Sequence, residues 1–174
     1  MDDEYRLWLI RERTFPVKVT ADDRRKLKAF INGFSYLHYG IEKDPDTFIF
    51  AKPCKFAKEK DKNDRSSTLK INGHPIGTLY RAVFVLEYER LPLPGFCISH
   101  PCGRSGSRCA EASHMEVVPQ KQNAERDACH ERIRKWEIQQ RNRGMKQKQR
   151  QGTVFDHLCS HVPQCYLQWG KFSL

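Results

Sequence analysis

Hydrophobic positions in the first part of the chain follow a helical period. Thr20, Ala21 and two acidic residues form a helix-start signal. The apolar positions that recur at helical spacing after it are Leu27, Phe30, Ile31 and Phe34. No chemical grouping accompanies them, so we expect a helix with a packing role.

A second helical period begins near Ile76 and ends before Leu91-Pro92, where proline stops a helix. Its recurring positions are Ile76, Leu79, Tyr80, Val83, Phe84 and Glu87. Because these positions are mainly apolar, we expect this helix to lie in the core.

Strand-like runs lie between the two helical patterns. Residues 47–57 predict a strand interrupted at Pro53, and Ser67–Ile71 predicts another that ends at the turn Asn72-Gly73, with a charged hairpin connection between them. Basic residues crowd this stretch: Lys52, Lys55, Lys58, Lys60, Lys62, Arg65 and Lys70. An antiparallel ribbon is thin enough to enter the major groove, so residues 46–75 are a candidate DNA-reading surface. A solvated lysine-rich loop is the alternative interpretation.

The composition indicates a small hydrophobic core and suggests that the chain binds metal ions. The chain has 174 residues, of which 39% are hydrophobic and 30% charged, so we expect one compact unit with a modest core. Seven Cys and seven His offer material for metal sites that replace missing core. An odd number of Cys in a reducing compartment fits zinc ligation better than disulfides.

The charge points to a polyanionic partner. The formal net charge is +10 and the sequence pI is about 9.4, which favours nucleic acid through counterion release. No apolar run approaches the roughly 18 residues of a spanning helix, and the acidic start at Met1–Glu4 is unlike a signal peptide. We expect an intracellular protein without a membrane partner or a small organic cofactor. A DNA substrate and the basic tract Lys146–Arg150 indicate the nucleus.

Three soft ligands, Cys102, Cys109 and His114, lie within thirteen residues of one another. They need one more donor to complete a tetrahedral zinc site. Cys54 is the preferred fourth ligand because it would join the ribbon to this segment. Cys97 is the competing candidate, and a chance grouping of buried cysteines is the alternative to a metal site.

A second cluster lies near the C-terminus. Cys159, His161 and Cys165 follow the tight spacing Cys-x-His-x3-Cys, and Cys129 is available as the fourth ligand, with His130 as a possible substitute. The intervening stretch, Glu131–Gln151, holds eight Lys or Arg and predicts a basic helix that frays near Gly144.

His100 and Asn123 are the candidate catalytic pair. His100 stands two residues before Cys102, and an imidazole fixed beside a zinc ligand suits a general base that deprotonates water near neutral pH. The Asn123 amide oxygen suits a hard cation such as Mg²⁺, which would take the charge developing on the leaving oxygen of a phosphodiester. A structural His and an uninvolved Asn are the alternatives.

The order of His100, Cys102, Cys109, His114, Asn123 and Cys129, followed by Cys159, His161 and Cys165, resembles the His-Cys box homing endonucleases. This intron-encoded family belongs to the His-Me finger nucleases. The resemblance covers residues 54–165 and is strongest over 97–129.

The resemblance implies a ββα-metal catalytic core, two structural zinc ions, one catalytic Mg²⁺, and a homodimer that makes a double-strand break in duplex DNA. It also implies an arginine beside the scissile phosphate, for which Arg65 is the candidate. The nine residues after Cys165 are few for a dimer built by exchanging C-terminal tails.

The fold expected from all these features is α+β: a small mixed domain with an antiparallel β ribbon, the catalytic core and two zinc sites. An N-terminal helical segment (1–45) precedes the nuclease domain (46–174), whose parts are the ribbon (46–75), the catalytic core (97–129), and the basic helix with the second zinc site (130–165). The competing functions are a non-catalytic, zinc-stabilised DNA-binding module and an RNA-binding protein that uses the helix at 131–143.

Overall fold

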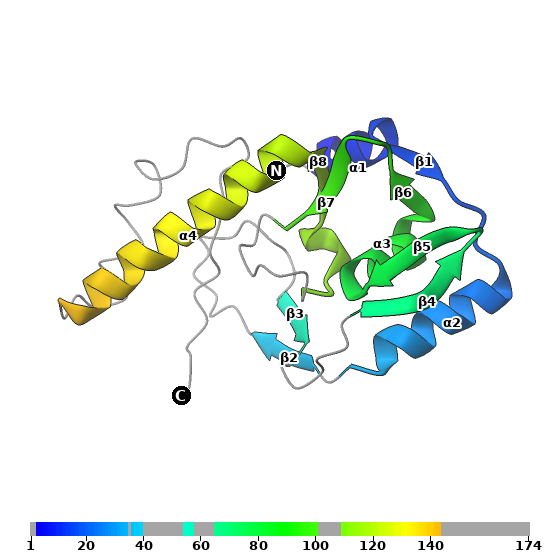
Figure 1. Cartoon of the computed structure of the whole chain (residues 1–174), viewed down its shortest axis with the longest axis horizontal. Helices are drawn as coiled ribbons and strands as arrows, with labels where there is room; N and C mark the ends of the chain where they lie inside the picture. Colours follow the sequence, from blue (N-terminus) through cyan, green and yellow to red (C-terminus); the bar gives the residue numbers. More distant parts are fainter. Residues whose placement is uncertain (1–2, 35, 40–53, 58–64, 101–108, 144–174) are drawn as a thin grey trace.

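The computed structural model describes residues 3–34, 36–39, 54–57, 65–100 and 109–143. Within these ranges the chain forms four α-helices and four two-stranded antiparallel sheets, β1–β6, β2–β3, β4–β5 and β7–β8 (Figure 1). The expected α+β class is therefore confirmed. Among the described residues, no helix combines the length and the apolar character needed to cross a membrane.

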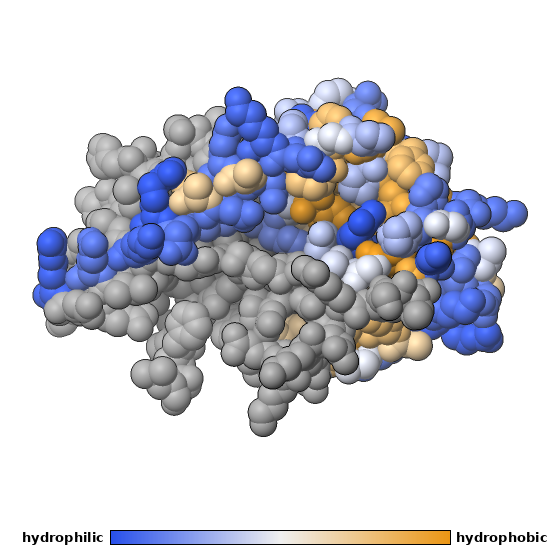
Figure 2. Space-filling model, viewed as in Figure 1, coloured by the Kyte–Doolittle hydropathy of each residue, from blue (hydrophilic) through white to orange (hydrophobic). Residues whose placement is uncertain are grey.

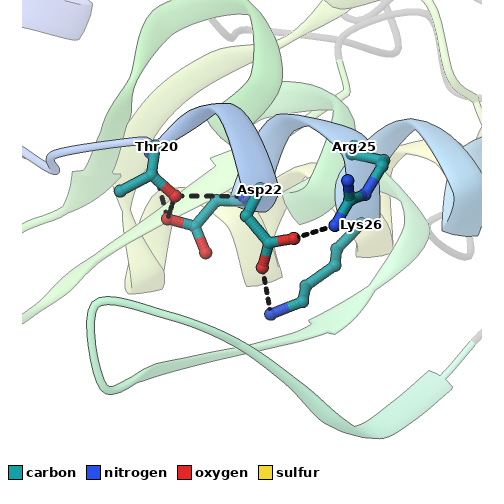
Figure 3. A network of polar contacts seen from close by, with 5 residues as sticks. Thr20, Asp22, Arg25 and Lys26 are labelled. Carbon is teal, nitrogen blue, oxygen red and sulfur yellow. Dashed lines mark hydrogen bonds and ion pairs between the residues drawn. The ribbon is translucent and has the colours of Figure 1, made fainter.

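The N-terminal region contains α1 (Asp3–Glu12), β1 (Thr14–Pro16) and α2 (Ala21–Asn32). Helix α2 begins where its capping signal predicts. The Thr20 hydroxyl accepts from the Asp23 backbone N–H at 3.1 Å, and the Asp23 carboxylate accepts from the Thr20 N–H at 3.0 Å (Figure 3). This reciprocal pair satisfies two backbone donors that a helix start leaves unpaired.

The N-terminal segment is more than helical, which corrects the prediction for residues 1–45. Strand β1 pairs with β6 (Arg90–Pro92), and β2 (Tyr36–Tyr39) pairs with β3 (Cys54–Ala57). Sequence reasoning missed β1 and β2 because both are short and take their partners from distant parts of the chain.

The expected ribbon also pairs differently from the prediction. Strand β4 (Arg65–Ile71) forms a hairpin with β5 (His74–Thr78), and β3 has β2 as its partner. The turn at Asn72-Gly73 is confirmed, since both residues take positive φ angles of 50° and 81°. The predicted hairpin connection between the two runs lies outside the described residues, as does the strand predicted at 47–53.

Helix α3 (Leu79–Tyr88) is the expected core helix, beginning three residues after Ile76. One cluster of buried side chains unites α2, α3, β4, β5 and β6, and a second unites α1, α3, β7 (Phe96–Ser99) and β8 (Glu116–Pro119). The members of the second cluster are Ile10, Phe84, Ile98, Met115 and Val117. Because Ile10 belongs to α1, the first helix shares a core with the strands on either side of the predicted zinc cluster.

The last described elements of the chain are a β-hairpin and the helix that follows it. Strand β7 pairs antiparallel with β8, a short 3-10 helix, η2 (Ala112–His114), precedes β8, and α4 (Gln120–Asn142) follows β8 directly. Helix α4 packs against both strands and extends beyond them (Figure 1). The predicted basic helix is confirmed to Asn142, although the helix begins earlier than predicted, at Gln120 and not near Glu131.

Candidate active site and metal centre

His100 stands at the end of strand β7. Its predecessor Ser99 pairs with Glu116, so His100 leaves the hairpin at the end where β8 begins. The Tyr80 ring of α3 meets the imidazole edge-on, with centroids 5.6 Å apart and planes at 82°. A strand end and a core helix therefore fix the position of this ring.

The two ring nitrogens of His100 have different surroundings. The imidazole hydrogen-bonds to the backbone of Cys109, while Nε2 is buried and has no hydrogen-bond partner among the described residues. The ring nitrogen that contacts the Cys109 backbone is therefore Nδ1. Burial lowers the pKa of His100 below its ordinary value, and the nearby Cys109 and Asp127 oppose that shift. A neutral imidazole with one nitrogen hydrogen-bonded and the other carrying an unshared lone pair is the form that a general base needs.

Asn123 is the fourth residue of α4 and is half-buried. Three residues later on the same helix, Arg126 forms a buried ion pair with Glu116 of β8. Residues three apart lie on neighbouring positions of one helix face, so Asn123 belongs to the part of α4 that faces the hairpin. The structure brings Asn123 and His100 into one hairpin-and-helix unit.

Cys109 and His114 lie together in the interior. Their side chains are fully buried, and Cys109 Sγ is 3.6 Å from His114 Nδ1. A tetrahedral zinc with Zn–S of about 2.3 Å and Zn–N of about 2.0–2.1 Å places its sulfur and nitrogen ligands about 3.6 Å apart. The same separation fits a thiol–imidazole hydrogen bond, so the geometry accommodates zinc without requiring it.

The backbone places Cys54 closer to this pair than its sequence number suggests. Cys54 begins β3, and the carbonyl of its neighbour Lys55 accepts from the Ala110 N–H at 2.7 Å. Strand β3 thus runs beside the segment that carries Cys109. Cys97 is half-buried on β7, where burial and the charge of Asp127 raise the pKa of its thiol.

The other predicted zinc ligands are only partly described. Cys129 and His130 are buried on α4. Cys102, Cys159, His161 and Cys165 lie outside the described residues. Within the described ranges, no group of three or more His, Cys, Asp or Glu side chains is arranged to hold a metal ion.

The candidate DNA-reading residues lie on two different sheets. Arg65 begins β4 and Lys70 is exposed on the same strand, while Lys55 belongs to β3. The Lys55 ammonium lies 4.2 Å from the centroid of the Tyr36 ring, a cation–π contact. The remaining predicted lysines, Lys52, Lys58, Lys60 and Lys62, lie outside the described residues.

Two polar contacts around the site were not predicted. One is the Glu116–Arg126 ion pair, whose side chains are each 1% exposed. The other joins α1 to the approach to β8: Arg6 donates to the Tyr88 hydroxyl at 2.8 Å, and that hydroxyl donates to the Ala112 carbonyl at 3.1 Å. A Glu inside the apolar run from Met115 to Val118 was the available signal for the first, because a charged residue in such a run needs a partner. Arg6 carried no comparable signal.

No family model matches the sequence, and no characterised protein or solved structure matches it either.

Proposed function

We propose that this chain is a divalent-metal-dependent DNA endonuclease of the homing type, with His100 as its general base and Asn123 as its metal ligand. The single observation that carries the proposal is the order of elements β7, β8 and α4, with His100 at the end of the first strand and Asn123 in the first turns of the helix. This hairpin-and-helix arrangement is the one expected of a ββα-metal core.

The surroundings of His100 suit proton abstraction. With Nδ1 engaged by the Cys109 backbone, Nε2 has no hydrogen-bond partner among the described residues, and its lone pair would take a proton from a water bound beside it. The resulting hydroxide oxygen forms a bond to phosphorus, and the bond from phosphorus to the leaving oxygen breaks. Burial lowers the pKa of His100, which favours the neutral form that acts as a base.

Asn123 would hold the divalent ion through its amide oxygen, which is a hard ligand suited to Mg²⁺. The ion would supply positive charge for the leaving oxygen. The side chain is half-buried, which leaves one side of it open to a phosphate and water.

Two zinc ions would stabilise the fold around this pair. Cys54, Cys102, Cys109 and His114 would form the first site, and Cys129, Cys159, His161 and Cys165 the second. The 3.6 Å separation of Cys109 and His114 and the backbone contact between Lys55 and Ala110 support the first set. The burial of Cys129 agrees with the second.

Duplex DNA is the proposed substrate, bound by a homodimer in the nucleus. The net charge of +10 supports a polyanionic partner. Hydrophilic side chains predominate along the visible face of α4, with apolar residues between them (Figure 2), and its exposed residues include Lys121, Arg132 and Lys135. Arg65 on β4 remains the proposed contact to the scissile phosphate.

Cleavage of a random duplex library in Mg²⁺ tests the proposal. We expect the wild type to cut, and His100→Ala to lose about 10²–10⁴-fold in rate while its DNA affinity and zinc content stay unchanged. Glu125→Gln is the control, since Glu125 is exposed on α4 and lies outside both the catalytic pair and the ribbon. Tight DNA binding by the wild type without cleavage in any divalent metal would instead favour the non-catalytic binding module.

A further inference from the structure

The Glu116–Arg126 ion pair closes the hairpin-and-helix unit at the end where His100 stands. Glu116 is the first residue of β8 and pairs in register with Ser99, the residue before His100. Arg126 is the seventh residue of α4, and both side chains are 1% exposed.

Chain lengths explain how the helix returns to this point. From Glu116, strand β8 runs away from His100 to Pro119, a length of about 10 Å at 3.3 Å per residue. Helix α4 then rises about 9 Å between Gln120 and Arg126 at 1.5 Å per residue. Because the two lengths agree, α4 runs back along β8, and Arg126 arrives level with Glu116 and Ser99.

The ion pair therefore sets the position of α4 along β8 and its rotation about the helix axis. Asn123 precedes Arg126 by three residues, and Cys129 follows it by three, so both lie within one turn of the contact. Asn123 lies about 4.5 Å before the level of that contact, at 1.5 Å per residue, so a shift of the helix along the strand would change its separation from the His100 strand end.

A buried ion pair is a poor source of stability. Removing two charges from water costs much of what their attraction returns, and a well-packed apolar pair of similar volume is often as stable. Separating the two charges would nevertheless leave each of them buried without its partner, so the pair disfavours positions of α4 that part Glu116 from Arg126. A site that needs an oxygen ligand on a helix to face an imidazole on a strand benefits from that restriction.

We propose that Glu116 and Arg126 are positioning residues that set α4 in the register where Asn123 presents its amide oxygen to the metal beside His100. This inference rests on the proposed function of Asn123. It adds a device for aligning the site that is separate from the zinc ligands.

The test compares the wild type with the double variant Glu116→Met/Arg126→Met, which replaces the ion pair by an apolar contact and keeps the fold testable. Glu125→Gln is the control, because it removes an exposed carboxylate from the neighbouring position of α4. Thermal unfolding, zinc content and DNA affinity in Ca²⁺ establish that each variant is intact.

Two readouts then follow: the Mg²⁺ concentration for half-maximal cleavage, and the broadening of His100 ring signals in NMR spectra when Mn²⁺ is added. The His100 signals are assigned by their absence from the His100→Ala spectrum. We expect the double variant to need about tenfold more Mg²⁺ or worse, to cut more slowly, and to lose the Mn²⁺ broadening at His100. The Glu125→Gln control should match the wild type in both.

The outcomes separate the two proposals. If the wild type cuts and the double variant matches it in Mg²⁺ requirement and broadening, the pair has no positioning role and the nuclease proposal stands. If the wild type does not cut, yet Mn²⁺ broadens His100 in it and not in the double variant, positioning stands and catalysis fails. Absence of Mn²⁺ broadening in the wild type overturns the positioning role, whatever the cleavage result. A double variant that fails to fold shows that the pair is needed for stability, which also contradicts the proposal.

Discussion

His100 receives its properties from the backbone and rings around it. The Cys109 backbone engages one ring nitrogen, the Tyr80 ring meets the imidazole edge-on, and burial lowers its pKa. Cys109 belongs to the candidate zinc cluster, so the residue that would hold metal also orients the candidate base.

Replacing Asn123 by Ala should abolish the role of the divalent ion while leaving the fold intact. We expect about a 10²-fold lower cleavage rate, because the ligand that places positive charge at the leaving oxygen is lost. Gln122→Ala is the matched control, since Gln122 is the half-buried neighbour of Asn123 on α4. Equal cleavage by the two variants in a Mg²⁺ titration would remove Asn123 from the site.

Contacts between side chains of the candidate site could be predicted only where the metal-ligand residues lie close together in the sequence. The spacing of Cys109 and His114 predicted their contact, which the structure places at 3.6 Å. The roles proposed for Glu116 and Arg126 were not predictable, because Arg126 stands between Glu125 and Asp127 in a polar stretch that looks solvent-exposed. Only the return of α4 along β8 brings its guanidinium to a buried carboxylate.

At the scale of elements, the start of α2 depends on one reciprocal contact. Thr20→Ala removes the hydroxyl that accepts from the Asp23 N–H, and we expect it to lower the free energy of unfolding by about 1 kcal/mol. Urea unfolding measures this difference. Lys28→Ala, an exposed substitution within the same helix, should change stability by much less; equal losses would show that the cap contributes nothing particular.

Because of the same cap, the free energy of unfolding should depend on pH. Hydrogen bonds from the Thr20 side chain and backbone hold the pKa of Asp23 below 3.8 in the folded chain. A carboxyl with a depressed folded pKa contributes stability above its unfolded pKa and loses it as pH falls through the folded value. Asp23→Asn should therefore be less stable than the wild type near about pH 7 and equal to it near about pH 2. A constant difference in urea unfolding across this range would contradict the prediction.

Elements with strong local signals were predicted, and elements whose pairing is long-range were not. The capping box gave α2, the apolar period gave α3, and Asn72-Gly73 gave the β4–β5 turn. The pairing of β3 with β2 was missed, since strand partners depend on contacts between distant residues.

At the scale of the whole molecule, distant segments meet around the candidate site. Ile10 of α1 packs with Ile98 and Val117, and Lys55 of β3 accepts a hydrogen bond from Ala110. A thin core with 30% charged residues gains from cross-links between such segments. The sequence predicted that zinc ligation by Cys54 would join the two segments; that ligation stays a prediction, and the structure gives the backbone contact of its neighbour Lys55 with Ala110.

The number of zinc ions bound per chain tests the proposed zinc links between these segments. We expect two zinc ions per chain in protein purified without added metal. Cys54→Ser and Cys109→Ser should each leave one, while Cys97→Ser should leave both. Retention of both ions by Cys54→Ser with loss of one by Cys97→Ser would make Cys97 the fourth ligand.

DNA affinity should depend steeply on salt. If several of the basic side chains contact phosphates, raising salt from about 50 to 200 mM should weaken binding by about 10³-fold, through counterion release. A titration of fluorescent duplex at several salt concentrations gives the slope. An affinity insensitive to salt would exclude phosphate contacts as the basis of binding.

The central claim is that His100 acts as a base in cutting DNA, and chemical rescue tests it most directly. His100→Gly should cut duplex DNA in Mg²⁺ far more slowly than the wild type, and added imidazole should restore part of the rate in proportion to its concentration. The same imidazole should not restore cleavage by Asn123→Ala, which lacks a different function. Wild-type cleavage rates in His100→Gly without imidazole, or no cleavage by the wild type on DNA that it demonstrably binds, would contradict the account.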